Sequence, residues 1–117
     1  MADRYEDARG VIQDILGPVD AVTRISTRQG CVRGNHIHHQ TVQWTFVLSG
    51  KLLIKTQAPG GPPQIHIYLP GEMACEQPGI AHAWRALEDT EVLVFTRGPR
   101  SGENYASDTE RLAVRLL

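Results

Sequence analysis

The stretch from Gly30 to Gly50 constrains the fold and the chemistry of this chain more than any other. It reads GCVRGNHIHHQTVQWTFVLSG and contains three of the five histidines. Side chains two residues apart on a strand point to the same face of a sheet. His36 and His38 can therefore aim two imidazoles at one point, as a metal site requires. His82, in the later stretch QPGIAHAW, can complete such a site from a neighbouring strand.

The composition is that of one ordinary globular domain covering residues 1–117, with 41% hydrophobic and 21% charged residues. The formal net charge of −1 provides no basic surface for nucleic acid or an anionic membrane. No apolar run is long enough to span a bilayer, and the start MADRYEDARG lacks the apolar core of a signal peptide. We therefore expect a cytoplasmic protein in which Cys31 and Cys75 are buried free thiols.

Alternation of apolar and polar residues between turns rich in glycine and proline predicts an all-β sandwich or barrel. The clearest strand is 42–48, where Gln43, Thr45 and Val47 share one face and Val42, Trp44, Phe46 and Leu48 share the other. The predicted strands are 11–16, 19–27, 31–38, 42–48, 52–56, 65–69, 73–75, 81–86 and 91–96, with residues 1–10 loose. Ser107 and Glu110 fit a capping box for a short C-terminal helix, and a non-helical ending is equally open.

Two motifs carry a resemblance to the cupin superfamily. The first, residues 30–50, is Gly30-x5-His36-x-His38-x4-Gln43-x6-Gly50, with glutamine where the family usually has glutamate. The second, residues 71–86, is Gly71-x5-Gln77-x-Gly79-x2-His82, with Gln77 at the usual proline position and Ala86 where asparagine is common. The resemblance implies a double-stranded β-helix, or jelly-roll barrel. It also implies a metal held by His36, His38, Gln43 and His82.

A narrower resemblance links Asp7–Gly10 and Arg33–His36 to RmlC-like cupins that act on nucleotide-activated sugars. These include sugar epimerases, ketoisomerases and the zinc-bearing cupin domain of a capsular polysaccharide reductase. The resemblance implies that Arg33, together with Asn35 in the same run, binds substrate and that His36 is a catalytic base. Tyr68 and Tyr105 are both candidates for the catalytic acid. His38 departs from the epimerase pattern, which lacks a metal-binding histidine there.

The implied cofactor is one divalent transition metal per chain. Three imidazoles and an amide are neutral ligands, so the ion keeps its double charge and suits Lewis-acid chemistry. Zinc, iron, nickel, copper, manganese and cobalt are all open as its identity. Gln43 either binds the metal through its amide oxygen or holds a ligand histidine by a hydrogen bond.

Three classes of function follow, and whether the chain is an enzyme stays open. The first is an isomerase, epimerase or accessory domain acting on a nucleotide-activated sugar or related carbohydrate. The second is a three-histidine metal-dependent dioxygenase of a small metabolite, and the third is a non-catalytic cupin that binds a small molecule. In each class we expect Trp84, on the same face as His82, to line the ligand cavity.

Two residue groups keep alternative interpretations. Arg33 is either an anion contact or a structural arginine. The row formed by Trp44, Phe46 and Leu48 either packs between the sheets or forms the interface of a homodimer, and we expect the homodimer because monomers rarely leave such a row open.

Overall fold

The computed structural model describes residues 4–99 and 106–117, and strands dominate it. The strands are β1 (Arg4–Asp7), β2 (Gly10–Gln13), β3 (Ala21–Thr27), β4 (Val32–His38), β5 (Val42–Ser49), β6 (Leu52–Gln57), β7 (Pro63–Tyr68), β8 (Met73–Glu76), β9 (Ala81–Ala86), β10 (Thr90–Arg97) and β11 (Thr109–Arg111). No helix among the described residues is long and apolar enough to cross a membrane.

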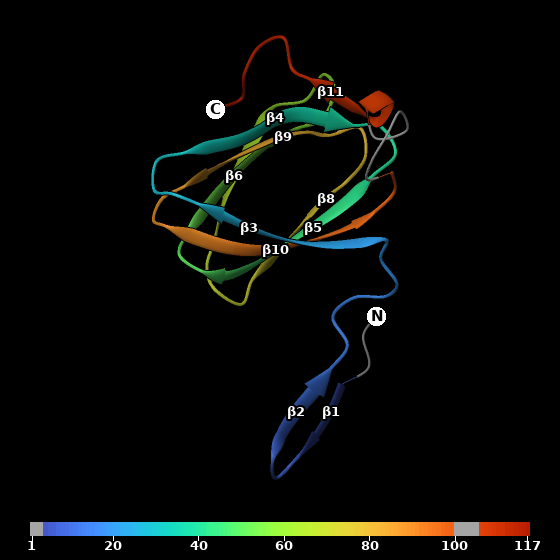
Figure 1. Cartoon of the computed structure of the whole chain (residues 1–117), viewed down its shortest axis with the longest axis vertical. Coiled ribbons are helices and arrows are strands. Elements are labelled where there is room, and N and C mark those ends of the chain that lie inside the picture. Colours follow the sequence, from blue (N-terminus) through green and yellow to red (C-terminus); the bar gives the residue numbers. More distant parts are fainter. Residues whose placement is uncertain (1–3, 100–105) are drawn as a thin grey trace.

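Two antiparallel sheets form the barrel (Figure 1). One has the strand order β3-β10-β5-β8, and the other has the order β11-β4-β9-β6-β7. The non-consecutive order places strands that are distant in sequence side by side, so that β4 pairs with β9 and β5 pairs with β10. The core between the sheets is built from Val47, Leu52, Ile54, Ala74, Trp84, Val92 and Val94. The predicted all-β jelly roll is thus confirmed.

Strand β5 has the two faces that its alternation predicted. Thr45 and Val47 are fully buried between the sheets, whereas Trp44 and Phe46 are only half-buried and face outward. The Arg97 guanidinium lies 5.0 Å from the centre of the Trp44 ring on this outer side. The interpretation that the Trp44–Phe46 row packs between the sheets is therefore wrong.

The two ends of the chain differ from the prediction. Residues 4–13 are not loose, because β1 and β2 pair from Arg4↔Gln13 to Asp7↔Gly10 and form a hairpin. This hairpin projects away from the barrel (Figure 1). At the other end, residues 106–108 are helical and β11 follows at once, so of the two open alternatives the helix through Leu112 and Leu116 is wrong.

The prediction of buried thiols is also wrong, since Cys31 and Cys75 are both free and exposed. Cys31 lies in the turn before β4. Cys75 lies on an edge strand, between the buried residues Ala74 and Glu76, so its side chain points outward. Tyr105, a candidate catalytic acid, lies outside the described residues.

Candidate functional site

His36, His38 and His82 converge inside the barrel. His36 and His38 lie on β4, and His82 on β9 is the register partner of His36. Each ring offers a nitrogen atom that lies within 4.8 Å of the other two. The ring centres are 4.5 Å apart for His36 and His38 and 4.6 Å apart for His36 and His82. The predicted convergence of three imidazoles from two adjacent strands is therefore present.

A β-bulge in β4 decides which side chains face the cavity. Arg33 pairs with Trp84 and His36 pairs with His82, although two residues separate Arg33 from His36 and only one separates their partners. The extra residue is Asn35, whose φ of 62° is left-handed. On a regular strand Arg33 and His36 would lie on opposite faces. The bulge lets both line the same cavity.

Burial keeps His36 and His82 neutral in the absence of a ligand. It lowers the pKa of His36 to about 4, helped by the charges of His38 and Arg111. It lowers the pKa of His82 to about 3, helped by His36 and His38. Neither ring nitrogen of His82 has a hydrogen-bond partner among the described residues. A buried imidazole without partners is costly, and a neutral one has a lone pair to donate, so this donor set fits a divalent cation.

The outer side of His38 is held by the C-terminal segment. Its Nδ1 lies 3.1 Å from the Thr109 hydroxyl and 3.5 Å from the Asp108 carboxylate. The Thr41 hydroxyl donates a 2.6 Å hydrogen bond to the same carboxylate. Such contacts on one imidazole nitrogen fix the orientation of the ring. Burial alone would raise the pKa of Asp108, but hydrogen bonds from Thr41 and Gln40 outweigh it and lower that pKa.

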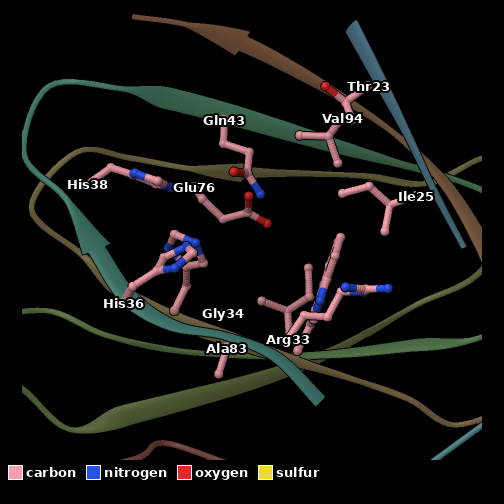
Figure 2. Close-up of a pocket in the computed structure, with 13 residues that line it drawn as sticks. Thr23, Ile25, Arg33, Gly34, His36, His38, Gln43, Glu76, Ala83 and Val94 are labelled. Carbon is pink, nitrogen blue, oxygen red and sulfur yellow. The ribbon is translucent and has the colours of Figure 1, made fainter. Parts of the chain in front are cut away.

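The histidines line a cavity of about 290 Å³ between the two sheets (Figure 2). Its wall combines polar groups, among them the three histidines, Gln43 and Glu76, with aliphatic and aromatic groups. The lining residues are Thr23, Ile25, Arg33, Gly34, His36, His38, Gln43, Ile54, Glu76, His82, Ala83, Trp84 and Val94.

Glu76 is a functional candidate that the sequence did not reveal. It is the register partner of Gln43 on β8 and is 4% exposed. Both of its oxygens accept from the Thr45 hydroxyl, at 3.1 and 3.2 Å, and Figure 2 shows the Gln43 amide turned toward it. Burial raises the pKa of Glu76 to about 8, against the opposing hydrogen bonds from Thr45 and Gln43. The cavity therefore contains a carboxyl group that is largely protonated at neutral pH.

The structure brings some predicted ligand contacts to this cavity and turns others away. Trp84 lines it, and its buried indole Nε1 has no hydrogen-bond partner among the described residues. Arg33 lines it too, while donating to the Thr27 hydroxyl and the Ser26 carbonyl. Asn35 does not reach it, because its side-chain amide bonds the backbone of Leu116 and Leu117.

Tyr68, a candidate catalytic acid, is absent from the cavity wall. Its ring packs against the core and lies 4.4 Å from the ring of His66 on the same strand. Among the described residues, the group in the wall best suited to donate a proton is the Glu76 carboxyl.

No protein-family model matches this sequence, and no curated protein matches it. Solved structures do match. A sugar 3,4-ketoisomerase, QdtA of Thermoanaerobacterium thermosaccharolyticum in complex with TDP, gives a TM-score of 0.75 at 17% identity over 96% of this chain and 85% of that chain. The dTDP-4-dehydrorhamnose 3,5-epimerase of Sulfolobus tokodaii gives 0.69 at 22% identity, over 92% of this chain and 72% of that chain.

The capsular polysaccharide assembling protein CapF of Staphylococcus aureus gives a TM-score of 0.72 at 21% identity over 97% of this chain. The match covers 33% of CapF, so this chain spans about a third of the length of that protein. Likeness at these identities establishes the fold. The chain therefore has a jelly-roll fold, as its two motifs predicted, with RmlC-like epimerases, QdtA and CapF as structural neighbours.

Proposed function

We propose that this chain is a metal-binding cupin that acts on a nucleotide-activated sugar or a related carbohydrate. The observation that carries the proposal is the cavity in which three convergent histidines face Glu76 and Trp84. It also holds an unpartnered indole donor, which suits a ligand rich in oxygen atoms. QdtA, one of the structural neighbours, is in complex with TDP.

His36, His38 and His82 are the residues that would hold the metal, with Gln43 as a further candidate through its amide oxygen. Such an ion, when bound, would polarise a carbonyl oxygen of the ligand. The His38 ring is already oriented for this by Thr109 and Asp108. His36 cannot be a metal ligand and a catalytic base through the same nitrogen, because a lone pair that binds an ion cannot also accept a proton.

If His36 is free of metal, it is neutral at pH 7 and can accept a proton from the carbon beside a ligand carbonyl. The carbon–hydrogen electron pair then moves into an enolate, and return of a proton to the opposite face completes an epimerisation. The Glu76 carboxyl is the proton donor in the cavity wall that suits this last step.

The test combines elemental analysis with proton exchange. We expect about one divalent transition metal per chain in the wild type and in His66→Ala, which removes an exposed histidine, and loss of the metal in His82→Ala. Incubation with TDP-4-keto-6-deoxyglucose in D₂O should place deuterium beside the keto group, as read by NMR. A metal content in His82→Ala equal to that of the wild type would exclude the metal assignment, and absence of exchange would exclude the isomerase.

The three-histidine cluster favours a second candidate, a metal-dependent dioxygenase of a small metabolite. Among the described residues, the close group of ligand atoms contains no carboxylate. Oxygen consumption by the iron-loaded protein on a panel of small metabolites would separate this candidate from the isomerase. Ligand binding without turnover in either assay would instead support the third class of function, a non-catalytic protein that binds a small molecule.

We also propose that the chain forms a homodimer. Support comes from the outward, half-buried Trp44 and Phe46 and from the hairpin that projects from the barrel.

A further inference from the structure

A second cavity lies beside β4, between that strand and the C-terminal segment. Its volume is about 560 Å³, larger than the histidine cavity. It is lined by Val32, Arg33, Gly34, Asn35, His36, Thr109, Arg111, Leu112 and Arg115. Three of these residues, Arg33, Gly34 and His36, also line the histidine cavity. The two cavities therefore adjoin each other at β4.

The second cavity is cationic. Three arginines line it, and no aspartate or glutamate of the described ranges does. The guanidinium groups of Arg111 and Arg115 are exposed and have no hydrogen bond or ion pair within the described residues. The nearest acidic side chain on β11, Glu110, is turned to His39, at 3.1 Å. The positive charge of Arg111 and Arg115 is thus available to a ligand.

Strand pairing places Arg111 next to the histidines. Arg111 is the register partner of His36, so the two side chains lie on the same face of the sheet. Thr109 pairs with His38 in the same way and contacts its ring. A group held by Arg111 therefore lies next to His36, at the boundary of the two cavities.

The C-terminal segment is fixed in this position by Asn35. The Asn35 carboxamide oxygen accepts hydrogen bonds from the amides of Leu116, at 2.8 Å, and Leu117, at 3.2 Å. The backbone oxygen of Asn35 accepts a further bond of 2.9 Å from the amide of Leu112. Figure 1 shows this segment running beside β4 and β11. These hydrogen bonds hold the backbone that carries Arg111 and Arg115 in place along the cavity.

We propose that this cavity binds the phosphate or diphosphate group of a ligand whose remaining part enters the histidine cavity, with Arg111 and Arg115 as its cationic contacts. The proposal rests on the proposed function and assigns the C-terminal segment a role in it. A guanidinium group presents paired donors that match phosphate oxygens, and such charge-assisted bonds are stronger than neutral ones. The anion can come from a nucleotide or from free diphosphate, which share this chemistry.

Calorimetric titration of the full chain with TDP, inorganic diphosphate and uncharged thymidine tests the proposal. Arg111→Ala and Arg115→Ala should each weaken TDP binding by about tenfold, the effect of one charge-assisted contact. Arg28→Ala is the matched control, because it removes an exposed arginine outside both cavities and should leave the affinity unchanged. Equal melting temperatures would show that the variants fold.

The outcomes separate this proposal from the proposed function. Arginine-dependent binding of TDP supports a nucleotide ligand, and arginine-dependent binding of diphosphate alone supports an anion site without a nucleotide. TDP binding that is unchanged in both arginine variants overturns the anion site and leaves the proposed function standing. If neither TDP nor diphosphate binds the wild type, the anion site is overturned, while metal content and deuterium exchange still judge the proposed function.

Discussion

The two facing residues Gln43 and Glu76 determine the electrostatics of the site. The first cupin motif usually has glutamate where this chain has Gln43. Strand pairing places the carboxyl group of Glu76 beside that position, on the adjacent strand. The cavity therefore keeps an acidic group, although the motif residue itself is neutral.

We predict that Glu76 makes the stability of the metal-free protein depend on pH. Its pKa is about 8 in the folded state and near 4.5 when unfolded, so the folded state holds this proton more tightly. The stabilisation is complete below pH 4.5 and is lost as the pH rises through 8. Between pH 7.5 and 8.5, where the histidines no longer titrate, the free energy of unfolding should fall, with a slope of at most about 1.4 kcal/mol per pH unit.

The measurement is urea unfolding with a chelator present at several pH values in that window. His36 and His82 do not confuse it, because burial lowers their pKa values and both rings are mostly neutral in either state above pH 7. Glu76→Gln should flatten the profile, since the amide does not titrate. Parallel profiles for the wild type and Glu76→Gln would show that Glu76 is ionised in the folded protein.

A second prediction concerns the metal affinity of Gln43→Glu. A carboxylate at position 43 adds a negative charge to an otherwise neutral donor set, so it should tighten divalent binding by about tenfold or more. Competition titration against a chelator measures this, with Gln43→Ala as the variant that removes the amide. An affinity for the metal that does not change in Gln43→Glu would place residue 43 away from the ion.

At the scale of single residues, the sequence predicted that the histidines converge. Strand periodicity places His36 and His38 on one face, and His82 needs only to lie on a neighbouring strand. It did not predict Glu76, which ends a short strand next to a turn and is a buried acid, a rare combination. Nor did it predict that Arg33 and His36 share a face, since that depends on the bulge at Asn35. A bulge leaves little signal in a single sequence.

Among the secondary structure elements, the turns were the informative signal. Glycine or proline lies in most of the connections between β3 and β10, and the predicted strands from 19 to 96 agree with β3–β10 to within two residues at each end. The ends of the chain gave no such signal. The β1–β2 hairpin has a charged sequence, and the three residues of β11 are ordered by pairing with the distant β4.

We predict that Gly50→Ala destabilises the fold far more than Gly60→Ala. Both glycines are left-handed, with φ of 92° and 71°, so alanine costs about 1 kcal/mol at either position. Only at Gly50 would the added Cβ collide with the Asp89 carbonyl and with Thr90, which join the β5–β6 turn to β10. The total cost at Gly50 should be about 3 kcal/mol or more.

Thermal or urea unfolding of the two variants measures this difference. Gly60→Ala is the matched control, because it has the same backbone strain and open space around the new methyl group. Similar losses in the two variants would mean that the turn at Gly50 can shift away from Asp89 and Thr90 at little cost.

For the whole molecule, two features lack a partner within the described chain. The outer face of the β3-β10-β5-β8 sheet presents apolar side chains in adjacent rows, among them Val22, Trp44, Phe46, Leu93 and Phe95. The β1–β2 hairpin leaves Tyr5 60% and Ile12 68% exposed. An isolated two-stranded hairpin is marginally stable in water. Burying the apolar side chains of this sheet face and of the hairpin requires apolar surface from outside the described chain.

A second copy of the chain is the economical source of that surface. The N-terminal residues Val11, Ile12 and Gln13 could have covered the Trp44–Phe46 row within one chain, but they lie in the projecting hairpin instead (Figure 1). Two-fold association is the commonest way to bury such a face, because one patch covers itself. We therefore predict a homodimer that packs sheet to sheet through Trp44 and Phe46.

Light scattering at micromolar concentration gives the mass of the particle, and a monomer mass for the wild type would refute the dimer. Phe46→Glu places a charge in the row and should yield a folded monomer, because Phe46 is only half-buried in the isolated chain. Ile67→Glu is the matched control, since Ile67 is 43% exposed on the other sheet and its replacement should leave the dimer intact. Unfolding of Phe46→Glu would instead assign the row to the core, and loss of the dimer in Ile67→Glu would move the interface to the opposite sheet.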